Sequence, residues 1–458
     1  MEKILAEVLK KIKPTQKEVA ELYALSDKVI YLIAKQNFRA TLEGSLAKGT
    51  WISGDHDVDI FAFFDKNVPK PDLMKKGLVL GKKIAKLLKA KFEVDYAEHP
   101  YTRIFYNNHT IDIVPCYEHK TLEELHSAVD RTPFHTAYVK KNIADSQKDD
   151  VRLLKQFMKG VQVYSAKEKV RGFSGYLCEL LILYYGSFGK VVKEAANNWK
   201  YGLILDLKGF YKPEQHSDLR ARFKHSLITI DPIDKNRNVS AALDNSKFEE
   251  FIFACKDFLQ KPSIKFFFPQ PPKLFSAAQL KTELKKRSPI VILKFKPPKL
   301  VEDVLYSQLR SSAAAISTQL KLNEFKVLES GIFSSDYSYL ILELENSELP
   351  KIKILEGPPV SVPQKFQDKF AQKYKKFEPW VEKGRWYAEV PRKFTKADLF
   401  LKDLLKKPER AGIGKYVGGQ IKKKYRLAVS SLQLAAEYKG EFAKFFTTFL
   451  TKKKAWEH

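Results

Sequence analysis

Two aspartates separated by one residue, Asp57 and Asp59, begin an apolar stretch, DVDIFAFF, that predicts a strand over 57–64. Side chains alternate along a strand, so both carboxylates project from one face while Val58 and Ile60 face the core. Paired carboxylates at this spacing lie close enough to grip a hard divalent cation. The pair therefore predicts a metal site at the start of this strand.

A third acid, Asp112, lies in the stretch TIDIVPCY, where Ile111 and Ile113 point away from it on another predicted strand. Three converging carboxylates are what a two-metal phosphoryl-transfer site requires. We therefore expect Asp57, Asp59 and Asp112 to be both the catalytic residues and the metal ligands, with Mg²⁺ as the ion.

A Gly-Ser pair, Gly44 and Ser45, precedes the first strand by about a dozen residues. Glycine permits a tight turn whose backbone N–H groups approach phosphate oxygens, and Lys48 adds a cation within reach. Each feature alone is weak, and surface acids beside an ordinary turn are the alternative. The joint spacing favours a nucleotide site.

The elements that position these residues form an αβ region after a helical lead-in. The stretches that read as its strands are Phe38–Glu43, 57–64, Phe92–Tyr96, Thr102–Tyr106 and Thr110–Pro115, with part of a helix at Gly81–Ala90. From Arg131 to about Gln260 the pattern is mainly helical.

Proline clusters follow near Lys261, where we place a boundary. Beyond it, a strand, a long helix and two strands are predicted at Ile290–Lys296, Val301–Leu322, Phe325–Ser334 and Tyr337–Leu344. The predicted fold class is α+β multidomain, with a catalytic domain of helices on a mixed sheet (1–138), a helical central domain (139–260) and an α+β C-terminal region (261–458).

The composition points to a polyanionic partner. Lysine and arginine number 81 against 54 aspartates and glutamates, a formal charge of +27, and a chain this basic repels itself unless it meets a polyanion such as RNA. A lysine-rich thermophile surface is the alternative, although such surfaces usually carry matching glutamate. The scattered cysteines suit no disulfide framework, and neither a signal peptide nor an apolar run of membrane-spanning length is present. A cytoplasmic location is expected.

The arrangement of Gly44, Ser45 and the three acids resembles the DNA polymerase β-like nucleotidyltransferase superfamily. Further blocks resemble archaeal (class I) CCA-adding enzymes, which are tRNA nucleotidyltransferases. These blocks are SAVDRTPFH (127–135), DVRLLKQFMK (150–159), KVRGFSGYLCELLILYYGSF (169–188) and DPIDKNRNVSAAL (231–243). The similarity is strong over Leu42–Asn245 and weak in the C-terminal third.

The resemblance implies roles for individual residues. His135, Lys155 and Tyr164 match positions that contact the incoming nucleotide, and Arg237 matches an arginine that reads the base of CTP or ATP. Taken one at a time, these residues also suit a helix cap, a solvated charge or a core position. His99 is a further candidate contact.

Two departures from the family pattern are visible. Lys48 stands where the family often has arginine, which replaces a bidentate phosphate contact by a point charge. Asp57 stands where relatives carry glutamate, a change of reach by one methylene.

The function that the resemblance implies is template-independent addition of C, C and A to the 3′ end of tRNA from CTP and ATP. The alternatives are a poly(A) or poly(U) polymerase, an enzyme that adds only CC or only A, and a non-catalytic RNA-binding protein. Retention of all three acids argues against the last, because unused carboxylates on a buried strand are costly. Family members are often dimeric, so a homodimer is also expected.

The C-terminal region is expected to hold the acceptor stem and TΨC arm of tRNA by phosphate contacts and A-form shape. Lysine, arginine and aromatic residues interleave in Lys373–Phe394, which is the candidate RNA-binding segment. An ordinary solvated amphipathic surface is the alternative.

Overall fold

The computed structural model describes residues 1–55, 57–96, 99–119, 121, 125 and 129–458. Ser127 and Ala128, the first two residues of one family-like block, lie outside the described residues. The chain divides into two compact units: unit 1 is Met1–Pro271 with Lys453–His458, and unit 2 is Pro272–Lys452. This division is coarser than the three predicted domains, whose boundaries stay a prediction.

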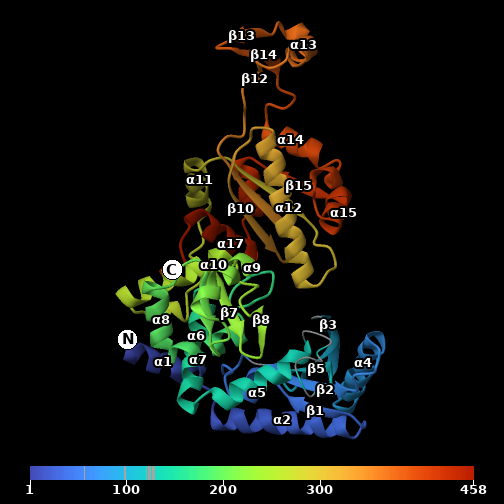
Figure 1. The fold of residues 1–458 in the computed structure, drawn as a ribbon, viewed down its shortest axis with the longest axis vertical. Helices are drawn as coiled ribbons and strands as arrows, with labels where there is room; N and C mark the ends of the chain where they lie inside the picture. Colours follow the sequence, from blue (N-terminus) through green and yellow to red (C-terminus); the bar gives the residue numbers. More distant parts are fainter. Residues whose placement is uncertain (56, 97–98, 120, 122–124, 126–128) are drawn as a thin grey trace. The chain divides into compact units, whose positions relative to one another are not determined.

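A five-stranded sheet with the order β1-β2-β5-β4-β3 forms the N-terminal part of unit 1 (Figure 1). Its strands are β1 (Arg39–Leu42), β2 (Asp57–Phe64), β3 (Lys91–Tyr96), β4 (Pro100–Tyr106) and β5 (His109–Tyr117). β2 and β5 run parallel, whereas the other neighbours are antiparallel. The mixed sheet and its five predicted strands are confirmed.

Helices α2 (Gln16–Ala34) and α4 (Lys70–Leu87) pack on one face of this sheet. Their apolar side chains meet Val58 and Ile60, which are both completely buried. The acids at alternate positions of β2 therefore project from the opposite face, as the strand period predicts.

The rest of unit 1 is mainly helical, as predicted. Its helices are α1 (Glu2–Ile12), α3 (Gly44–Lys48), α5 (Thr132–Asn142), α6 (Asp145–Gly160), α7 (Gly175–Tyr185), α8 (Phe188–Asn197), α9 (His216–Phe223) and α10 (Asn245–Gln260). A three-stranded sheet that the sequence pattern did not predict lies among them, formed by β6 (Leu203–Asp206), β7 (Leu227–Asp231) and β8 (Asp234–Asn238). α1, α6, α7, α8 and α10 share one core, in which Phe157 touches several other phenylalanine rings.

The last six residues of the chain return to unit 1. Trp456 is buried and stacks on Phe266, with 5.4 Å between ring centroids. Its indole N–H donates a hydrogen bond to Asp257 on α10 at 3.1 Å. Lys454 pairs with Glu250 on the same helix at 2.9 Å. The C-terminal segment is therefore part of the core of unit 1.

Unit 2 contains a four-stranded sheet with the order β10-β11-β9-β15. The strands are β9 (Ile290–Phe295), β10 (Val327–Ser334), β11 (Ser338–Leu344) and β15 (Tyr425–Ala428), and α12 (Glu302–Leu322) follows β9. The predicted order of strand, long helix and two strands is confirmed.

A second sheet of unit 2 has the order β12-β14-β13. It consists of β12 (Ile352–Pro359), β13 (Trp380–Glu382) and β14 (Arg385–Pro391). The remaining helices of unit 2 are α11 (Ala277–Lys286), α13 (Gln364–Lys373), α14 (Ala397–Leu404), α15 (Lys415–Lys423), α16 (Ser431–Glu437) and α17 (Gly440–Thr451). The α+β multidomain class is thus confirmed. None of the helices in the described part of the chain is long and apolar enough to cross a membrane.

The return of the C-terminus leads to a stability prediction. Replacing Trp456 by alanine removes a buried stack and leaves Asp257 without its indole donor, so the free energy of unfolding of unit 1 should fall by about 3 to 5 kcal/mol. Urea unfolding of the full chain, followed by hydrogen exchange of the α10 amides, measures this change. The control is Leu432→Ala, because Leu432 is 83% exposed. Equal midpoints for the two variants would contradict the assignment.

Candidate functional site

The three acids lie on the two parallel strands of the unit 1 sheet. In the register of β2 and β5, Asp59 stands directly opposite Asp112, and Asp57 stands opposite Thr110. The side chains of directly opposed residues project from the same face of a sheet and lie close together. The structure therefore places the three predicted ligands side by side.

Mutual repulsion is visible in the protonation of Asp59. Burial, with the charges of Asp112 and Asp57, raises the pKa of Asp59 from 3.8 to about 7. Burial also raises the pKa of Asp112, against the opposing effect of Arg103. Carboxylates that are held close together repel one another, and a bound cation relieves that repulsion.

Arg103 is a residue of this site that sequence reasoning missed. It stands opposite Asp112 in the register of β4 and β5. Its Nε and Nη2 donate to the two oxygens of Asp112 at 2.9 and 2.7 Å, and Nη1 donates to Asp95 at 2.7 Å. The guanidinium thus bridges Asp112 and Asp95, and its single positive charge offsets part of their negative charge.

The fit of a divalent cation depends on these contacts. Asp57, Asp59 and Asp112 offer only carboxylate oxygens, the donors that hard divalent cations take. In the described part of the chain, no group of three His, Cys, Asp or Glu side chains already has the geometry of a metal site. Arg103 occupies both oxygens of Asp112. The donor set fits such a cation once Asp112 turns away from Arg103.

Gly44 lies directly against Asp59. A Cβ built on Gly44 would be 2.0 Å from Asp59 Oδ2, and the backbone φ of +69° also suits glycine. Any side chain here would displace the carboxylate. Ser45 follows in the first turn of α3, so the Gly-Ser turn and the acids belong to one site.

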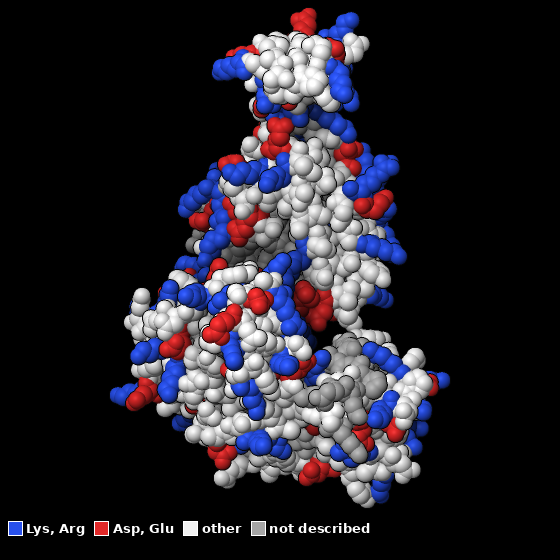
Figure 2. All heavy atoms as spheres, viewed as in Figure 1, with Lys and Arg blue, Asp and Glu red and all other residues white. Residues whose placement is uncertain are grey.

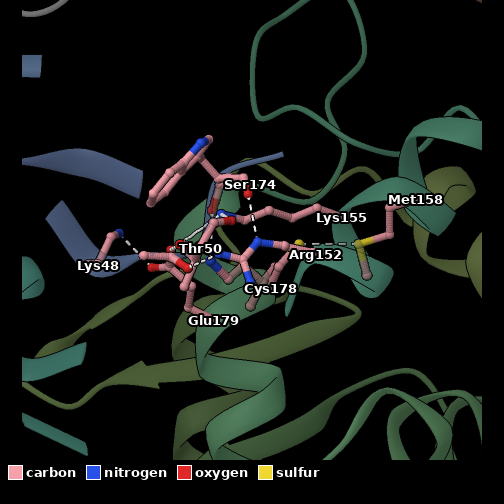
Figure 3. Close-up of polar contacts among 11 residues, drawn as sticks. Lys48, Thr50, Arg152, Lys155, Met158, Ser174, Cys178 and Glu179 are labelled. Carbon is pink, nitrogen blue, oxygen red and sulfur yellow. Dashed lines mark hydrogen bonds and ion pairs between the residues drawn. The ribbon is translucent and has the colours of Figure 1, made fainter. Parts of the chain in front are cut away.

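A buried cluster around Glu179 contains two of the predicted nucleotide contacts (Figure 3). Glu179 Oε2 accepts from Lys48 Nζ at 2.6 Å. The other oxygen, Oε1, accepts from the hydroxyl of Thr50 at 2.6 Å and from Lys155 Nζ at 3.3 Å. Lys48 comes from α3, Lys155 from α6 and Glu179 from α7. The cluster joins the catalytic sheet region to the helical region.

Tyr164 reaches the same cluster. A Cβ built on Gly175 would be 3.1 Å from the Tyr164 hydroxyl and 3.8 Å from Lys155 Nζ, so the absence of a side chain at Gly175 leaves space for both groups. Burial raises the pKa of Tyr164, so its hydroxyl is protonated and can donate a hydrogen bond.

A second cluster collects the other two predicted contacts around Asp231, the last residue of β7. Its Oδ2 accepts from Arg237 Nη1 at 2.7 Å and lies 2.9 Å from His135 Nε2. Its Oδ1 accepts from the hydroxyl of Tyr176 at 3.2 Å. Asp231 is completely buried, whereas the side chain of Arg237 is 35% exposed.

The two clusters touch through Tyr176. The Tyr176 ring stacks on His135 with 4.0 Å between centroids, and Lys48 Nζ lies 5.8 Å from the centre of the same ring. Five predicted nucleotide contacts, namely Lys48, His135, Lys155, Tyr164 and Arg237, are therefore brought together in unit 1. His99 is buried directly before β4, and its role stays a prediction.

Sequence reasoning missed Glu179, Asp231 and Tyr176, although one signal was present. Glu179 is the single charged residue of α7, whose sequence GYLCELLILYY is otherwise apolar or aromatic. A lone acid on an apolar helix needs a buried counter-charge, and this pattern alone identifies it as a residue with a partner.

Comparison with known families identifies three matching regions. The family described as nucleotidyltransferase domain matches residues 28–135. The one described as tRNA nucleotidyltransferase, second domain, matches 149–268, and the one described as CCA-adding enzyme, C-terminal domain, matches 286–430.

Individual relatives agree with these regions. The CCA-adding enzyme of Methanosarcina mazei is 41% identical, over 87% of this chain and 88% of its own length. That of Methanothermobacter thermautotrophicus is 37% identical, over 98% of both chains. A solved structure of the Cid1 poly(U) polymerase superposes with a TM-score of 0.44 and 15% identity, over 57% of this chain and 94% of that chain. A likeness of that size carries no information about activity.

The raised pKa of Asp59 leads to a prediction for the metal-free protein. The pKa is about 7 in the folded chain and 3.8 without the burial and its charged neighbours. The stability that the neutral carboxyl contributes is therefore fully present below pH 4 and is lost as the pH rises to 7. The variant Asp59→Asn should unfold at a higher temperature than the parent above pH 7, by several degrees, and at the same temperature below pH 4.

Thermal unfolding in chelator from about pH 3 to about pH 8 measures this difference. Asp27→Asn is the control, because Asp27 is exposed on α2. A constant difference between Asp59→Asn and the parent at every pH would contradict the repulsion among the acids.

Proposed function

Since the chain belongs to the family of archaeal CCA-adding enzymes, we propose that Asp57, Asp59 and Asp112 hold Mg²⁺ while the Glu179 and Asp231 clusters bind the incoming nucleotide. The enzyme is a nucleotidyltransferase that builds the CCA end of tRNA without a nucleic-acid template. The observation that carries the residue assignments is the register of β2 and β5, which sets Asp59 opposite Asp112 with Gly44 against it.

In the reaction, the tRNA 3′-hydroxyl attacks the α-phosphorus of CTP, twice, and then that of ATP. Each attack forms a phosphodiester bond and breaks the α–β phosphoanhydride bond, so pyrophosphate leaves. Bound divalent ions lower the pKa of the attacking hydroxyl and neutralise the leaving pyrophosphate. The chain's own residues supply position and the remaining charge.

The triphosphate is assigned to the cationic side of the site. The turn at Gly44 and Ser45 lets phosphate oxygens approach the backbone, because no side chain stands at Gly44. Lys48 and Lys155 are the buried cations beside it. Tyr164 adds a protonated hydroxyl next to Lys155.

The base is assigned to Arg237 and His135. Asp231 accepts from one terminal nitrogen of Arg237, which fixes the plane of a guanidinium that is still 35% exposed. A fixed guanidinium presents directed N–H groups to a base edge. Burial lowers the pKa of His135, and its Nε2–H donates to Asp231, so Nδ1 is left as an acceptor for the base edge.

We assign tRNA binding to basic surfaces of the protein. These surfaces contact the phosphates of the acceptor stem and TΨC arm and recognise the A-form shape of the RNA. Figure 2 shows lysine and arginine side chains spread over the face of the molecule that it draws, with fewer acids between them. The candidate segment Lys373–Phe394 includes β13, β14 and the end of α13. Within it, Lys375 and Lys376 are exposed. A homodimer and a cytoplasmic location also stay predictions, which light scattering and cell fractionation test.

The catalytic assignment predicts a separation of chemistry from RNA binding. Asp59→Ala or Asp112→Ala should lower nucleotide incorporation by at least about a hundredfold, because even outer partners of metal ligands are worth about 10- to 100-fold. Binding of tRNA should stay nearly unchanged, since both acids belong to unit 1 and the candidate RNA-binding segment Lys373–Phe394 belongs to unit 2. The measurement uses Mg²⁺, tRNA that lacks its CCA end, and labelled CTP or ATP, separately and together.

The unmodified enzyme is the control and should add CC from CTP, and A only after CC. A ladder of A or U would identify a polymerase instead. Loss of tRNA binding in both aspartate variants would contradict the proposed division of roles.

The tRNA assignment predicts a change in salt dependence. Replacing Lys375 and Lys376 by glutamine should weaken tRNA binding and reduce the slope of log affinity against log salt by roughly 1.4 to 1.8, because each phosphate contact contributes about 0.7 to 0.9. Filter binding between 50 and 300 mM salt measures the slope. The matched control removes Lys281 and Lys285, two exposed lysines of α11 in the same unit. An equal change in both double variants would show that only net charge matters.

A further inference from the structure

Glu179 is a completely buried carboxylate in the middle of an apolar helix. It accepts hydrogen bonds from three side chains, Lys48, Thr50 and Lys155, which all lie far from it in the sequence. A buried carboxylate is expensive, and an apolar residue of similar size would suit α7 better by itself. The presence of Glu179 is therefore explained only by what it does to its partners.

Its two cationic partners are themselves buried. Their side chains are 8% exposed for Lys48 and 4% exposed for Lys155. The ammonium groups come from α3 and α6, and Figure 3 shows both directed at the one carboxylate. One carboxylate between two ammonium groups leaves a net positive charge, which suits a polyanionic ligand such as a triphosphate.

The hydrogen bonds of the two lysines differ. Among the described residues, Lys48 gives one N–H to Glu179 at 2.6 Å, which leaves two N–H groups for a ligand. Lys155 gives its three to Glu179, the Thr50 carbonyl and the Thr50 hydroxyl at 3.3, 3.1 and 3.2 Å. These are long for charge-assisted hydrogen bonds. Lys155 can therefore exchange one of them for a phosphate oxygen at little loss.

We propose that Glu179 is a positioning residue that aims Lys48 and Lys155 at the triphosphate of the incoming nucleotide and holds a countercharge beside Lys155, without touching the nucleotide itself. This inference rests on the proposed role of the two lysines in triphosphate binding. The new element is that the Glu179 carboxylate sets the affinity for the nucleotide and the pH dependence of that affinity.

The pH dependence follows from the groups that surround Lys155. These are Lys48 from α3, Glu179 and the Cys178 thiol from α7, and the nearby Tyr164 hydroxyl. Burial lowers the pKa of Lys155, and the charge of Glu179 opposes that effect. Without Glu179, the pKa of Lys155 falls further, so its ammonium loses the proton at a lower pH. A buried neutral amine no longer attracts a phosphate.

The test is Glu179→Gln, with KM for CTP, KM for tRNA and kcat measured between pH 6.5 and 10. An opposite charge at this distance shifts a pKa by about 1 to 3 units, so the pH at which KM for CTP begins to rise should move down by that amount. At pH 9, KM for CTP should increase by up to about tenfold for each unit by which the Lys155 pKa falls, because a lowering of one unit removes up to about nine-tenths of its charged form. KM for tRNA should not change.

The matched control is Glu250→Gln. Glu250 also lies between two lysines of unit 1, Lys247 at 2.7 Å and Lys454 at 2.9 Å, but outside the site. The Glu250→Gln protein should be less stable than the parent, but the dependence of KM for CTP on pH should not change. Glu179→Asp, which keeps the charge and shortens the reach, should raise KM for CTP while it retains the parent pH profile. It serves as the second variant if the glutamine chain folds poorly.

The proposal is overturned if Glu179→Gln and Glu250→Gln give the same CTP pH profile as the parent, or if Glu179→Asp shifts the profile as the glutamine does. The variant Lys155→Ala distinguishes failure of the positioning role of Glu179 from failure of the proposed function, in which Lys155 binds the triphosphate. If Lys155→Ala leaves KM for CTP unchanged, the assignment of the lysine to the triphosphate fails. If it raises KM while Glu179→Gln has no effect, only the positioning role fails.

Discussion

The parallel pairing of β2 with β5 sets Asp59 directly against Asp112, and the repulsion between these carboxylates shapes the surrounding site. Carboxylates forced together on a buried sheet stay together only where protons, cations or hydrogen-bond donors compensate their charge. The structure uses two of these means. Asp59 is held with a pKa near 7, and Arg103 spans Asp112 and Asp95. The parallel register therefore creates a need for positive charge, part of which the Arg103 guanidinium supplies.

The part of the site around Lys48 and Lys155 also depends on compensation of charge, but here the groups to be compensated are cations. Lys48 and Lys155 are buried cations, and Glu179 makes their burial tolerable. Asp231 is the buried partner of Arg237, whose side chain is 35% exposed, and it also lies against His135. The contacts of Lys48 with Glu179 and of His135 with Asp231 join elements that are distant in the sequence. These buried charges thus hold the helical region against the sheet that carries the three acids.

Much of this arrangement could be predicted from local patterns. The period of two along a strand correctly put Val58 and Ile60 in the core, and therefore Asp57 and Asp59 on the other face. The order of strand, long helix and two strands in unit 2 was also predicted, because β9 and β11 are mostly apolar runs and α12 is a long helix. The family-like blocks placed the nucleotide contacts in one region, although the roles of individual residues there stay predictions.

The features that could not be predicted depend on contacts between distant residues. The sheet β6-β7-β8 was missed because its strands are short and β8, with the sequence DKNRN, is polar. Arg103, Glu179 and Asp231 were missed because their importance lies in partners on other elements, such as the pair of Glu179 with Lys48, 131 residues away. Lys48 was expected to be a phosphate contact, and nothing in the sequence around it indicates that a helical carboxylate also binds it.

The return of the last six residues to unit 1 has a consequence for biosynthesis. A chain emerges from the ribosome N-terminus first, and domains usually fold in that order. Here unit 1 is interrupted by the whole of unit 2, so Trp456 reaches Phe266 only after all of unit 2 has been translated. A nascent chain that stops anywhere within unit 2 carries the acids and lysines of the site but lacks the tryptophan that completes their scaffold. We expect such a fragment to be less stable than the full chain and more exposed to proteolysis, which couples the persistence of unit 1 to completion of unit 2.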